Sequence, residues 1–401
     1  DIYDIYIVPT SWGETGWVQE ESDERAWLDN KIRATSAIMD PKNSETAEQR
    51  AAGFDISLQI TIPNEWERYA PDNIGYTAGI ETTQVSPEWL EKANMMDRII
   101  VVSNHSKEVF EKTVYDFAHR ETGEKMTLKC ETPIEVVNYA IREFDPAPMD
   151  IELEYDFNYL VIAQWGPRKN IENTVKWFVE ENFDQEVGLV LKTFIRRGNV
   201  IDRYYTEGKI REYLNNNHKD RKCKVYLLHG DLTEQEMYSL YRHDKIKCFL
   251  SLTHGEGFGL PIFEAACAGI PVICPGWSGQ NDYLWIPETT GKKKKTKQKP
   301  HFANVDFSLE PVPDYAIWPG VINEGVMWCE PAQGSYKMRL RQVRKNYDKW
   351  KKKSIKLQDW IIENFSEEKQ YKAFALALDP FYIDNSDLTK WLEDLNAQEF
   401  E

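Results

Sequence analysis

The chain has 401 residues, of which 41% are hydrophobic and 29% are charged, and its formal net charge is −17 at pH 7. This length exceeds what one hydrophobic core usually supports, so we expect two domains in an ordinary soluble globular protein. No run approaches the roughly 20 apolar residues that span a bilayer, and the negative charge disfavours non-specific attraction of the whole surface to nucleic acid or anionic membrane.

The first half of the chain alternates short apolar runs with helical segments. An apolar run at residues 5–8 predicts a strand, and a turn containing Gly13 and Gly16 leads from it to a helix at 19–39. Strand, glycine turn and helix are the opening of an α/β unit. Ser103 offers a side-chain oxygen that can cap a further helix. More strands are predicted at residues 56–60, 99–102 and 134–137.

A linker is predicted at residues 142–154, which are polar and contain two prolines. Beyond it, strands and helices alternate at the spacing of a parallel, doubly wound sheet, and the strands are near-continuous apolar runs that suit a sheet covered on both faces. We expect strands at 159–163, 188–192, 225–228, 248–252 and 271–274, and helices at 172–181, 202–215, 233–243 and 261–268.

The last quarter of the chain changes character. Residues 291–319 are lysine-rich, then rich in proline and aromatic residues, which indicates an inserted mobile loop, whereas 335–376 has the apolar spacing of helices. The six cysteines form no CxxC pair and the N-terminal residues lack the pattern of a secretory signal. We therefore predict reduced cysteines in a cytoplasmic protein.

A glycine-rich loop at residues 255–259 joins a predicted buried strand to a predicted helix that begins near Pro261. Backbone amides at such a helix start, together with the positive end of the helix dipole, form a site for a diphosphate. Glu256 lies in the loop and Glu264 about one turn into the helix, so both carboxylates can accept hydrogen bonds from the vicinal hydroxyls of a sugar or ribose. A tight turn with incidental acids is the alternative interpretation of this stretch alone.

The whole string EGFGLPIFE, with Glu256 and Glu264 separated by seven residues, resembles the signature of the retaining glycosyltransferases of family 4. The resemblance implies the GT-B fold, an α/β architecture of two Rossmann-like, doubly wound domains that face each other across a cleft, with a C-terminal helix region. Residues 1–145 would form the acceptor domain and 155–350 the nucleotide-sugar donor domain, while the helices of 351–401 would pack back on the first domain.

The resemblance also implies roles for single residues. Glu256 would contact the donor sugar near the reacting centre and Glu264 the nucleotide ribose. In the segment AQWGPRKN (163–170), Lys169 matches the lysine that holds the donor diphosphate; the family's arginine directly after the strand is replaced by Gln164, which leaves open whether Arg168 supplies that charge. The remaining donor-binding candidates are Gly13, Gly16, Lys192, Gly257, Phe258, Gly259 and Leu260.

The implied reaction is retaining transfer of a hexose from a UDP- or GDP-sugar, such as UDP-glucose, to an acceptor hydroxyl. Lys169, Arg168 and the amides near Gly259 would stabilise the departing nucleoside diphosphate. The sequence shows no HxxxH or DxD spacing, and GT-B enzymes generally do without a bound metal, so we predict no metal and no tightly bound cofactor. His254 is expected to be structural, and His105 to be a helix cap or a surface residue.

Three other functions remain open from the sequence. A phage-type enzyme would glucosylate hydroxymethylated bases of DNA; the basic run from Lys292 to Lys299 permits a DNA acceptor, although a solvated loop is the simpler interpretation and the overall acidity argues against it. A nucleotide-sugar epimerase uses the same fold, and a non-enzymatic sugar-nucleotide binding module is the third. The donor base, the donor sugar, the acceptor and the oligomeric state are not determined by the sequence.

Overall fold

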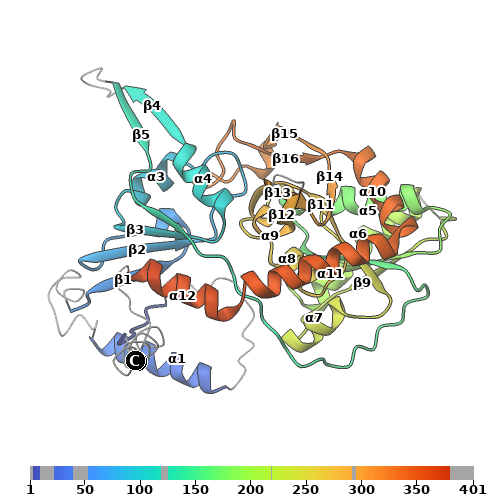
Figure 1. Ribbon diagram of the computed structural model, residues 1–401, viewed down its shortest axis with the longest axis horizontal. Coiled ribbons are helices and arrows are strands. Elements are labelled where there is room, and N and C mark those ends of the chain that lie inside the picture. Colours follow the sequence, from blue (N-terminus) through green and yellow to red (C-terminus); the bar gives the residue numbers. More distant parts are fainter. Residues whose placement is uncertain are drawn as a thin grey trace, which may run out of the picture.

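The computed structural model describes residues 3–9, 22–38, 53–118, 125–217, 219–290 and 295–379. Two parallel sheets, one in each half of the chain, confirm the predicted α/β architecture (Figure 1). The N-terminal sheet has four strands in the order β1-β2-β3-β6, and the C-terminal sheet has six in the order β14-β11-β10-β7-β8-β9. Gly13 and Gly16, and the turn predicted around them, lie outside the described residues.

The first described residues of the N-terminal half do not form the predicted strand. Residues 5–8, where a strand is predicted, form none: the Ile7 amide donates a hydrogen bond to Thr35 Oγ1 at 2.8 Å, and Ile5 and Val8 are 44% and 56% exposed. An apolar run forms a strand only where a neighbouring strand completes its hydrogen bonds. The elements of this half are α1 (Asp23–Ile38), β1 (Ile56–Ile60), β2 (Asp72–Thr77), α3 (Pro87–Ala93), β3 (Arg98–Val101), α4 (Asn104–Lys112), β4 (Val114–Ala118), β5 (Lys125–Lys129) and β6 (Ile134–Val136).

Ser103 caps α4 as predicted, since its side chain accepts a hydrogen bond from the Ser106 amide at 3.2 Å. The core between α3, α4 and the sheet contains the buried rings of Trp66, Trp89 and Phe110. Strands β4 and β5 pair only with each other and project from this half as a hairpin (Figure 1).

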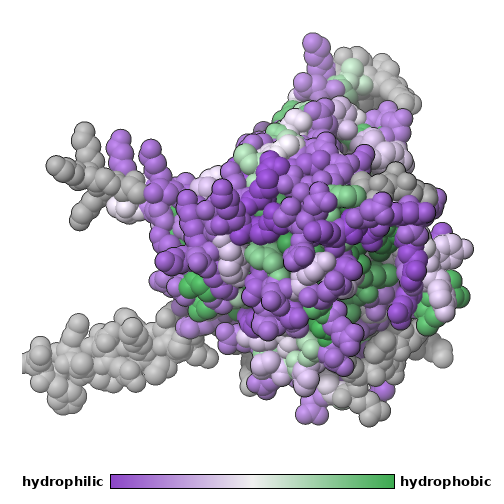
Figure 2. All heavy atoms as spheres, turned by 90° about the vertical axis from the view of Figure 1, so that its right-hand side faces the viewer, coloured by the Kyte–Doolittle hydropathy of each residue, from purple (hydrophilic) through white to green (hydrophobic). Residues whose placement is uncertain are grey.

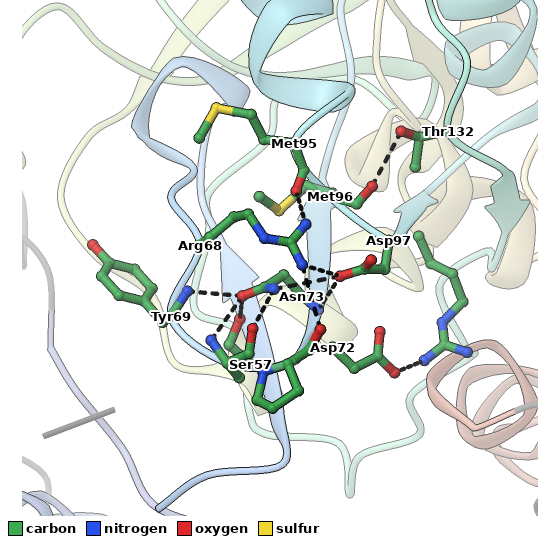
Figure 3. A network of polar contacts seen from close by, with 12 residues as sticks. Ser57, Arg68, Tyr69, Asp72, Asn73, Met95, Met96, Asp97 and Thr132 are labelled. Carbon is green, nitrogen blue, oxygen red and sulfur yellow. Dashed lines mark hydrogen bonds and ion pairs between the residues drawn. The ribbon is translucent and has the colours of Figure 1, made fainter. Parts of the chain in front are cut away.

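A polar network joins the amino ends of β1, β2 and β3 (Figure 3). Its centre is the fully buried Asn73, whose Oδ1 accepts hydrogen bonds from the Tyr69 amide at 2.8 Å and from Ser57 Oγ at 2.9 Å. Asp97 Oδ2 accepts the Asn73 amide at 2.8 Å and pairs with Arg68 at 3.2 Å. Buried polar groups are tolerated when they are hydrogen-bonded in this way, so the network fixes the sheet edge opposite the carboxyl ends of the strands.

The C-terminal half follows the predicted alternation closely. Its strands β7, β8, β10 and β11 are largely buried, as expected for a parallel sheet covered by helices on both faces. The elements are β7 (Asn158–Gln164), α5 (Ile171–Asn182), β8 (Gly188–Phe194), α6 (Val200–Asn217), β9 (Lys224–Leu228), α7 (Glu234–Tyr241), β10 (Ile246–Leu250), α8 (Leu260–Cys267), β11 (Val272–Pro275) and α9 (Asn281–Leu284). The face of this half shown in Figure 2 is covered mainly by hydrophilic side chains.

The mobile loop predicted for residues 291–319 is wrong for the part that the structure describes. β12 (Trp285–Thr290) and β13 (Lys295–Pro300) form an antiparallel ribbon, β14 (Ala303–Val305) pairs with β11 as the edge of the main sheet, and β15 (Phe307–Pro311) pairs with β16 (Met327–Pro331). The lysines of β13 alternate with Thr296 and Gln298, so the composition suggested a loop. A solvent-exposed ribbon tolerates that composition because its backbone is paired along the strand.

Three helices end the described chain: α10 (Gln333–Lys345), α11 (Tyr347–Asn364) and α12 (Glu367–Leu378). α12 returns to the N-terminal sheet, where Phe374 meets Tyr76 with ring centroids 6.0 Å apart and Ala377 packs beside Ile74. The predicted linker has neither helix nor strand, and the Ile141 amide beside it donates to the Phe365 carbonyl oxygen at 2.8 Å. The domain boundaries themselves stay predictions.

All six cysteines are free, as expected from their spacing. None of the helices in the described ranges is both long enough and apolar enough to cross a membrane. The cytoplasmic location stays a prediction.

Candidate active site

The carboxyl edge of the C-terminal sheet brings two predicted segments together. β7 and β10 are neighbours in this sheet, so the 3-10 helix Pro167–Lys169 (η3) after β7 lies beside the glycine loop after β10. The His254 amide donates to the Arg168 carbonyl oxygen at 2.8 Å and ties the two loops to each other. Residues that are far apart in the sequence therefore form one site because parallel strands end at the same edge.

The buried Glu256 and the partly buried Arg168 and Lys169 form one cluster. Lys169 Nζ lies 2.6 Å from Glu256 Oε1 and 2.8 Å from Oε2, and Arg168 Nη1 lies 3.0 Å from Oε2. Arg168 Nη1 also donates to the Gly255 carbonyl oxygen at 2.7 Å. The structure thus brings together the three residues proposed from the sequence to act at the reacting centre.

Glu81, which the sequence did not single out, completes this cluster from the N-terminal half. Its Oε1 lies 3.1 Å from Arg168 Nη1. It follows β2, a strand that the sequence reading missed, so its place at the carboxyl edge of the N-terminal sheet was not recognisable. Two carboxylates and two cations, drawn from both halves, therefore balance each other in the cluster.

The pKa values of the two carboxylates in the cluster are shifted in opposite directions from the ordinary value. Burial acts to raise the pKa of Glu256, but the neighbouring charges of Arg168 and Lys169 outweigh it and hold that pKa below its ordinary value. Burial raises the pKa of Glu81, with Arg168 opposing only in part. Glu256 is thus the firmly ionised member and Glu81 the more easily neutralised one.

The loop that holds Glu256 is fixed by the turn after β11. The Glu256 amide donates to Ser278 Oγ at 2.8 Å, and the Gly279 amide donates to the Glu256 carbonyl oxygen at 2.9 Å. Gly259 precedes α8 with φ 89°, in the left-handed region that favours glycine. The carboxylate of Glu256 is therefore presented by a rigid backbone.

The other two glycines of the loop face protein backbone. A Cβ on Gly257 would lie 2.3 Å from the Ala78 carbonyl oxygen, and one on Gly255 would lie 2.5 Å from the Glu81 carbonyl oxygen. Both glycines thus leave room for backbone of the N-terminal half, while donor binding by Gly257 stays a prediction. The glycine loop is consequently a contact between the halves as well as the start of a helix.

Glu264 occupies a separate environment from the Glu256 cluster. Its Oε2 accepts a hydrogen bond from Tyr241 Oη at 2.8 Å, and burial raises its pKa. It lines a pocket of about 180 Å³ between α7, α8 and the linker, together with Arg142 and Glu234. The two carboxylates of the Glu-x7-Glu string are therefore set apart, one among cations and one at a pocket.

The other donor-binding candidates are placed as follows. Lys192 donates to the Gly230 carbonyl oxygen after β9. The side chain of Phe258 is 3% exposed and packs in the core against Tyr283, whose hydroxyl donates to the Gly259 carbonyl oxygen at 2.9 Å. Leu260 is 42% exposed at the first position of α8.

Further contacts join the halves around the site. Asp282 Oδ2 accepts hydrogen bonds from the Asn104 amide at 2.9 Å and from Asn138 Nδ2 at 3.0 Å.

The ring of His105 lies 5.1 Å from that of Trp277, and burial lowers the His105 pKa to about 4. His105 is thus neither the cap of α4 nor an exposed side chain, which corrects the sequence-based expectation.

His254 is structural in the sense that we predicted. It is 5% exposed, its ring stacks on Trp328 at 4.2 Å, and its Nδ1 lies 2.6 Å from the Cys329 carbonyl oxygen.

Among the described residues, no group of three or more His, Cys, Asp and Glu side chains is arranged to hold a metal ion. Metal independence stays a prediction.

Comparison with known proteins identifies the segment that forms this site. Residues 154–292 match the model of the family described as "Glycosyl transferases group 1". No curated protein sequence matches the chain significantly. The matched segment includes Arg168, Lys169, Glu256 and Glu264.

Solved structures show the fold of the whole chain. Sucrose-phosphate synthase from Thermosynechococcus elongatus aligns with a TM-score of 0.53 and 14% identity, over 99% of this chain and 87% of that one. A structure from E. coli described as trehalose-6-phosphate bound with UDP-2-fluoro glucose aligns with a TM-score of 0.52 and 11% identity, over 90% and 79% of the two chains. These similarities establish the GT-B fold.

S. aureus TarM, in a structure that contains UDP, aligns with a TM-score of 0.47 and 12% identity over 78% of this chain. The present chain spans about half, 51%, of the length of that TarM chain.

Proposed function

We propose that the chain is a retaining glycosyltransferase that moves a hexose from a UDP- or GDP-sugar to an acceptor hydroxyl. The observation that supports this most directly is the contact of Arg168 and Lys169 with the buried Glu256, at the sheet's carboxyl edge in the segment that matches glycosyl transferases group 1. Open α/β sheets bind ligands at this edge. A solved structure of similar fold, from E. coli, contains UDP-2-fluoro glucose, which supports the same class of donor.

In the proposed reaction, the protein stabilises the negative charge that develops on the departing nucleoside diphosphate. Lys169 Nζ and the Arg168 guanidinium would face the phosphates, and the start of α8 would add the positive end of the helix dipole. Two cations and a helix start can compensate this charge without a metal, so we propose metal-independent transfer. Glu256 would lie against the donor sugar.

Glu264 is proposed to bind the nucleoside half of the donor. Its ionised form accepts hydrogen bonds from vicinal hydroxyls, and Tyr241 already holds one of its oxygens. The pocket beside it is lined by Tyr238 and Phe144, whose ring centroids lie 6.2 Å apart. An aromatic pocket next to a carboxylate suits a ribose and its base.

The experiment that tests this function is the release of nucleoside diphosphate by the purified chain from UDP-glucose and from GDP-mannose, each with and without a chelator. Release from one donor, at an unchanged rate in chelator, is expected. An epimerase would instead convert the nucleotide sugar into an isomer of equal mass without transfer. If no donor yields a nucleoside diphosphate, the transferase proposal fails.

A DNA acceptor is kept as the second candidate because a basic surface accompanies the ribbon. Lys295 and Lys297 are exposed on β13, and Lys349, Lys352 and Lys356 follow one another at helical spacing along the neighbouring α11. Lys292 lies outside the described residues. Salt-dependent transfer to duplex DNA with hydroxymethylated bases, compared with free sugars, discriminates between the two acceptors.

A further inference from the structure

Arg168 is shared between carboxylates of the two halves. Its Nη1 lies 3.0 Å from Glu256 Oε2 and 3.1 Å from Glu81 Oε1, so one guanidinium nitrogen bridges both. The side chains of Glu256 and Glu81 are only 10% and 18% exposed. Each charge in the cluster therefore depends on its neighbours for compensation more than on water.

A diphosphate cannot join this cluster without an exchange of partners. The positive charges of Arg168 and Lys169 are already balanced by two carboxylates. A bound diphosphate adds negative charge at the same cations, and like charges in a poorly hydrated site repel strongly. One carboxylate must therefore lose its ion pair with these cations when the donor binds.

Glu81 is the carboxylate that can give up its ion pair with Arg168. Glu256 keeps Lys169 on both of its oxygens if Arg168 is withdrawn, and its backbone is anchored to Ser278. Arg168 is the one cation recorded within ion-pair distance of Glu81 in the described part of the chain. Exchange therefore costs Glu81 its ion pair, whereas Glu256 remains paired.

Such an exchange needs only a side-chain rotation. The Glu81 carbonyl oxygen accepts a hydrogen bond from Trp277 Nε1 at 3.4 Å and lies against Gly255, so its backbone is held by the C-terminal half. The carboxylate can turn away from Arg168 while this backbone contact persists.

We propose, resting on the proposed diphosphate donor, that Glu81 is an exchangeable partner of Arg168. It pairs with the guanidinium while the donor site is empty, and the donor diphosphate takes its place. Glu81 then competes with the donor and with the nucleoside diphosphate product for the same cation. Because it belongs to the half predicted to bind the acceptor, donor occupancy is signalled to that half by release of this side chain.

The test compares Glu81→Gln with the wild-type chain in calorimetric titrations with UDP, GDP and inorganic pyrophosphate. The amide has nearly the same size but no charge, so we expect pyrophosphate and the preferred nucleotide to bind roughly five- to tenfold more tightly. Glu91→Gln, an exposed acid on α3, is the matched control and should leave both affinities unchanged. Lys169→Ala should weaken both.

The outcomes separate this inference from the proposed function. Unchanged or weaker binding in Glu81→Gln, with normal binding in the wild type, overturns the exchange and leaves the function standing. A wild-type chain that binds none of the three ligands overturns both. If the Gln variant does not fold by thermal melting, Glu81→Asp replaces it: the shorter side chain draws the carboxylate away from Arg168, and the affinity should rise by a smaller factor.

Discussion

Lys169 Nζ contacts both carboxylate oxygens of Glu256, at 2.6 and 2.8 Å, within a cluster that also includes Arg168. The lysine from the loop after β7 thereby fixes the orientation of a carboxylate from the loop after β10. Any change to Glu256 consequently alters the charge compensation of two partly buried cations as well as the group that would face the donor sugar.

The first prediction concerns Glu256→Gln. Turnover should fall on the order of 100-fold, because the charge at the proposed reacting centre is lost. The melting temperature should also fall, since Arg168 and Lys169 lose a partner in a poorly hydrated site. Steady-state kinetics and thermal melting measure the two effects. Near-normal turnover with a lowered melting temperature would show that Glu256 is only structural.

Glu264→Gln should act on binding rather than on the chemical step. Loss of a charged acceptor beside the pocket should raise the dissociation constant of the nucleoside diphosphate about tenfold, with little change in turnover at saturating donor. Titration of UDP or GDP measures this. Tyr241→Phe removes only the neutral donor to Glu264, and it is the matched control with a smaller expected effect.

Gly257→Ala tests the contact between the halves. The added methyl group would lie 2.3 Å from the Ala78 carbonyl oxygen, so the glycine loop and the N-terminal segment must separate, at a cost of about 1–3 kcal/mol. Denaturant unfolding should show this loss, together with reduced activity. Gly334→Ala on α10 has nothing within 4 Å of the added atom and should be neutral or slightly stabilising. Equal stability of the two variants would contradict the close approach.

Asp282→Ala removes a junction between the halves. The amide of Asn104 and the side chains of Asn104 and Asn138 all donate to Asp282 Oδ2. Leaving these donors without their acceptor should lower the free energy of unfolding by about 2 kcal/mol. Asp348→Asn, an exposed acid on α11, is the control, and a similar loss in that variant would argue against a specific junction.

His105 predicts a pH dependence of stability. Burial lowers its pKa to about 4 from an ordinary value of 6.5, so as the pH falls between these values the unfolded chain binds a proton that the folded chain resists. Stability should therefore decrease toward low pH by about 2–3 kcal/mol from this residue. Comparing unfolding free energies of wild type and His105→Gln at pH 7 and pH 4.5 isolates the contribution. An identical slope in both proteins would contradict it.

The C-terminal half could be predicted from the sequence because its signals are local. Its parallel strands are continuous apolar runs, and EGFGLPIFE marks the turn that presents Glu256. Clustering of Glu256 with Arg168 and Lys169 follows once the strands before them are neighbours in a parallel sheet. The side chains of Lys192 and Phe258 engage a backbone carbonyl and the core, and their role in donor binding stays a prediction.

The N-terminal half was harder to predict because its informative contacts are long-range. β2 begins with Asp72 and Asn73 and includes Gly75, whose open side accommodates the ring of Trp66, so it lacks the apolar run of a strand. Missing β2 concealed Glu81. Residues 5–8 show the opposite case: their apolar run predicts a strand, but they pair with no strand in the described part of the chain. Pairing between distant segments, which composition does not record, decides both cases.

The chain passes between its halves twice, once through the segment around Ile141 and once at Phe365 between α11 and α12. The two passages are hydrogen-bonded to each other, from the Ile141 amide to the Phe365 carbonyl oxygen at 2.8 Å. Because both passages lie together, a change in the position of one half relative to the other must be accommodated at this hydrogen-bonded pair of segments.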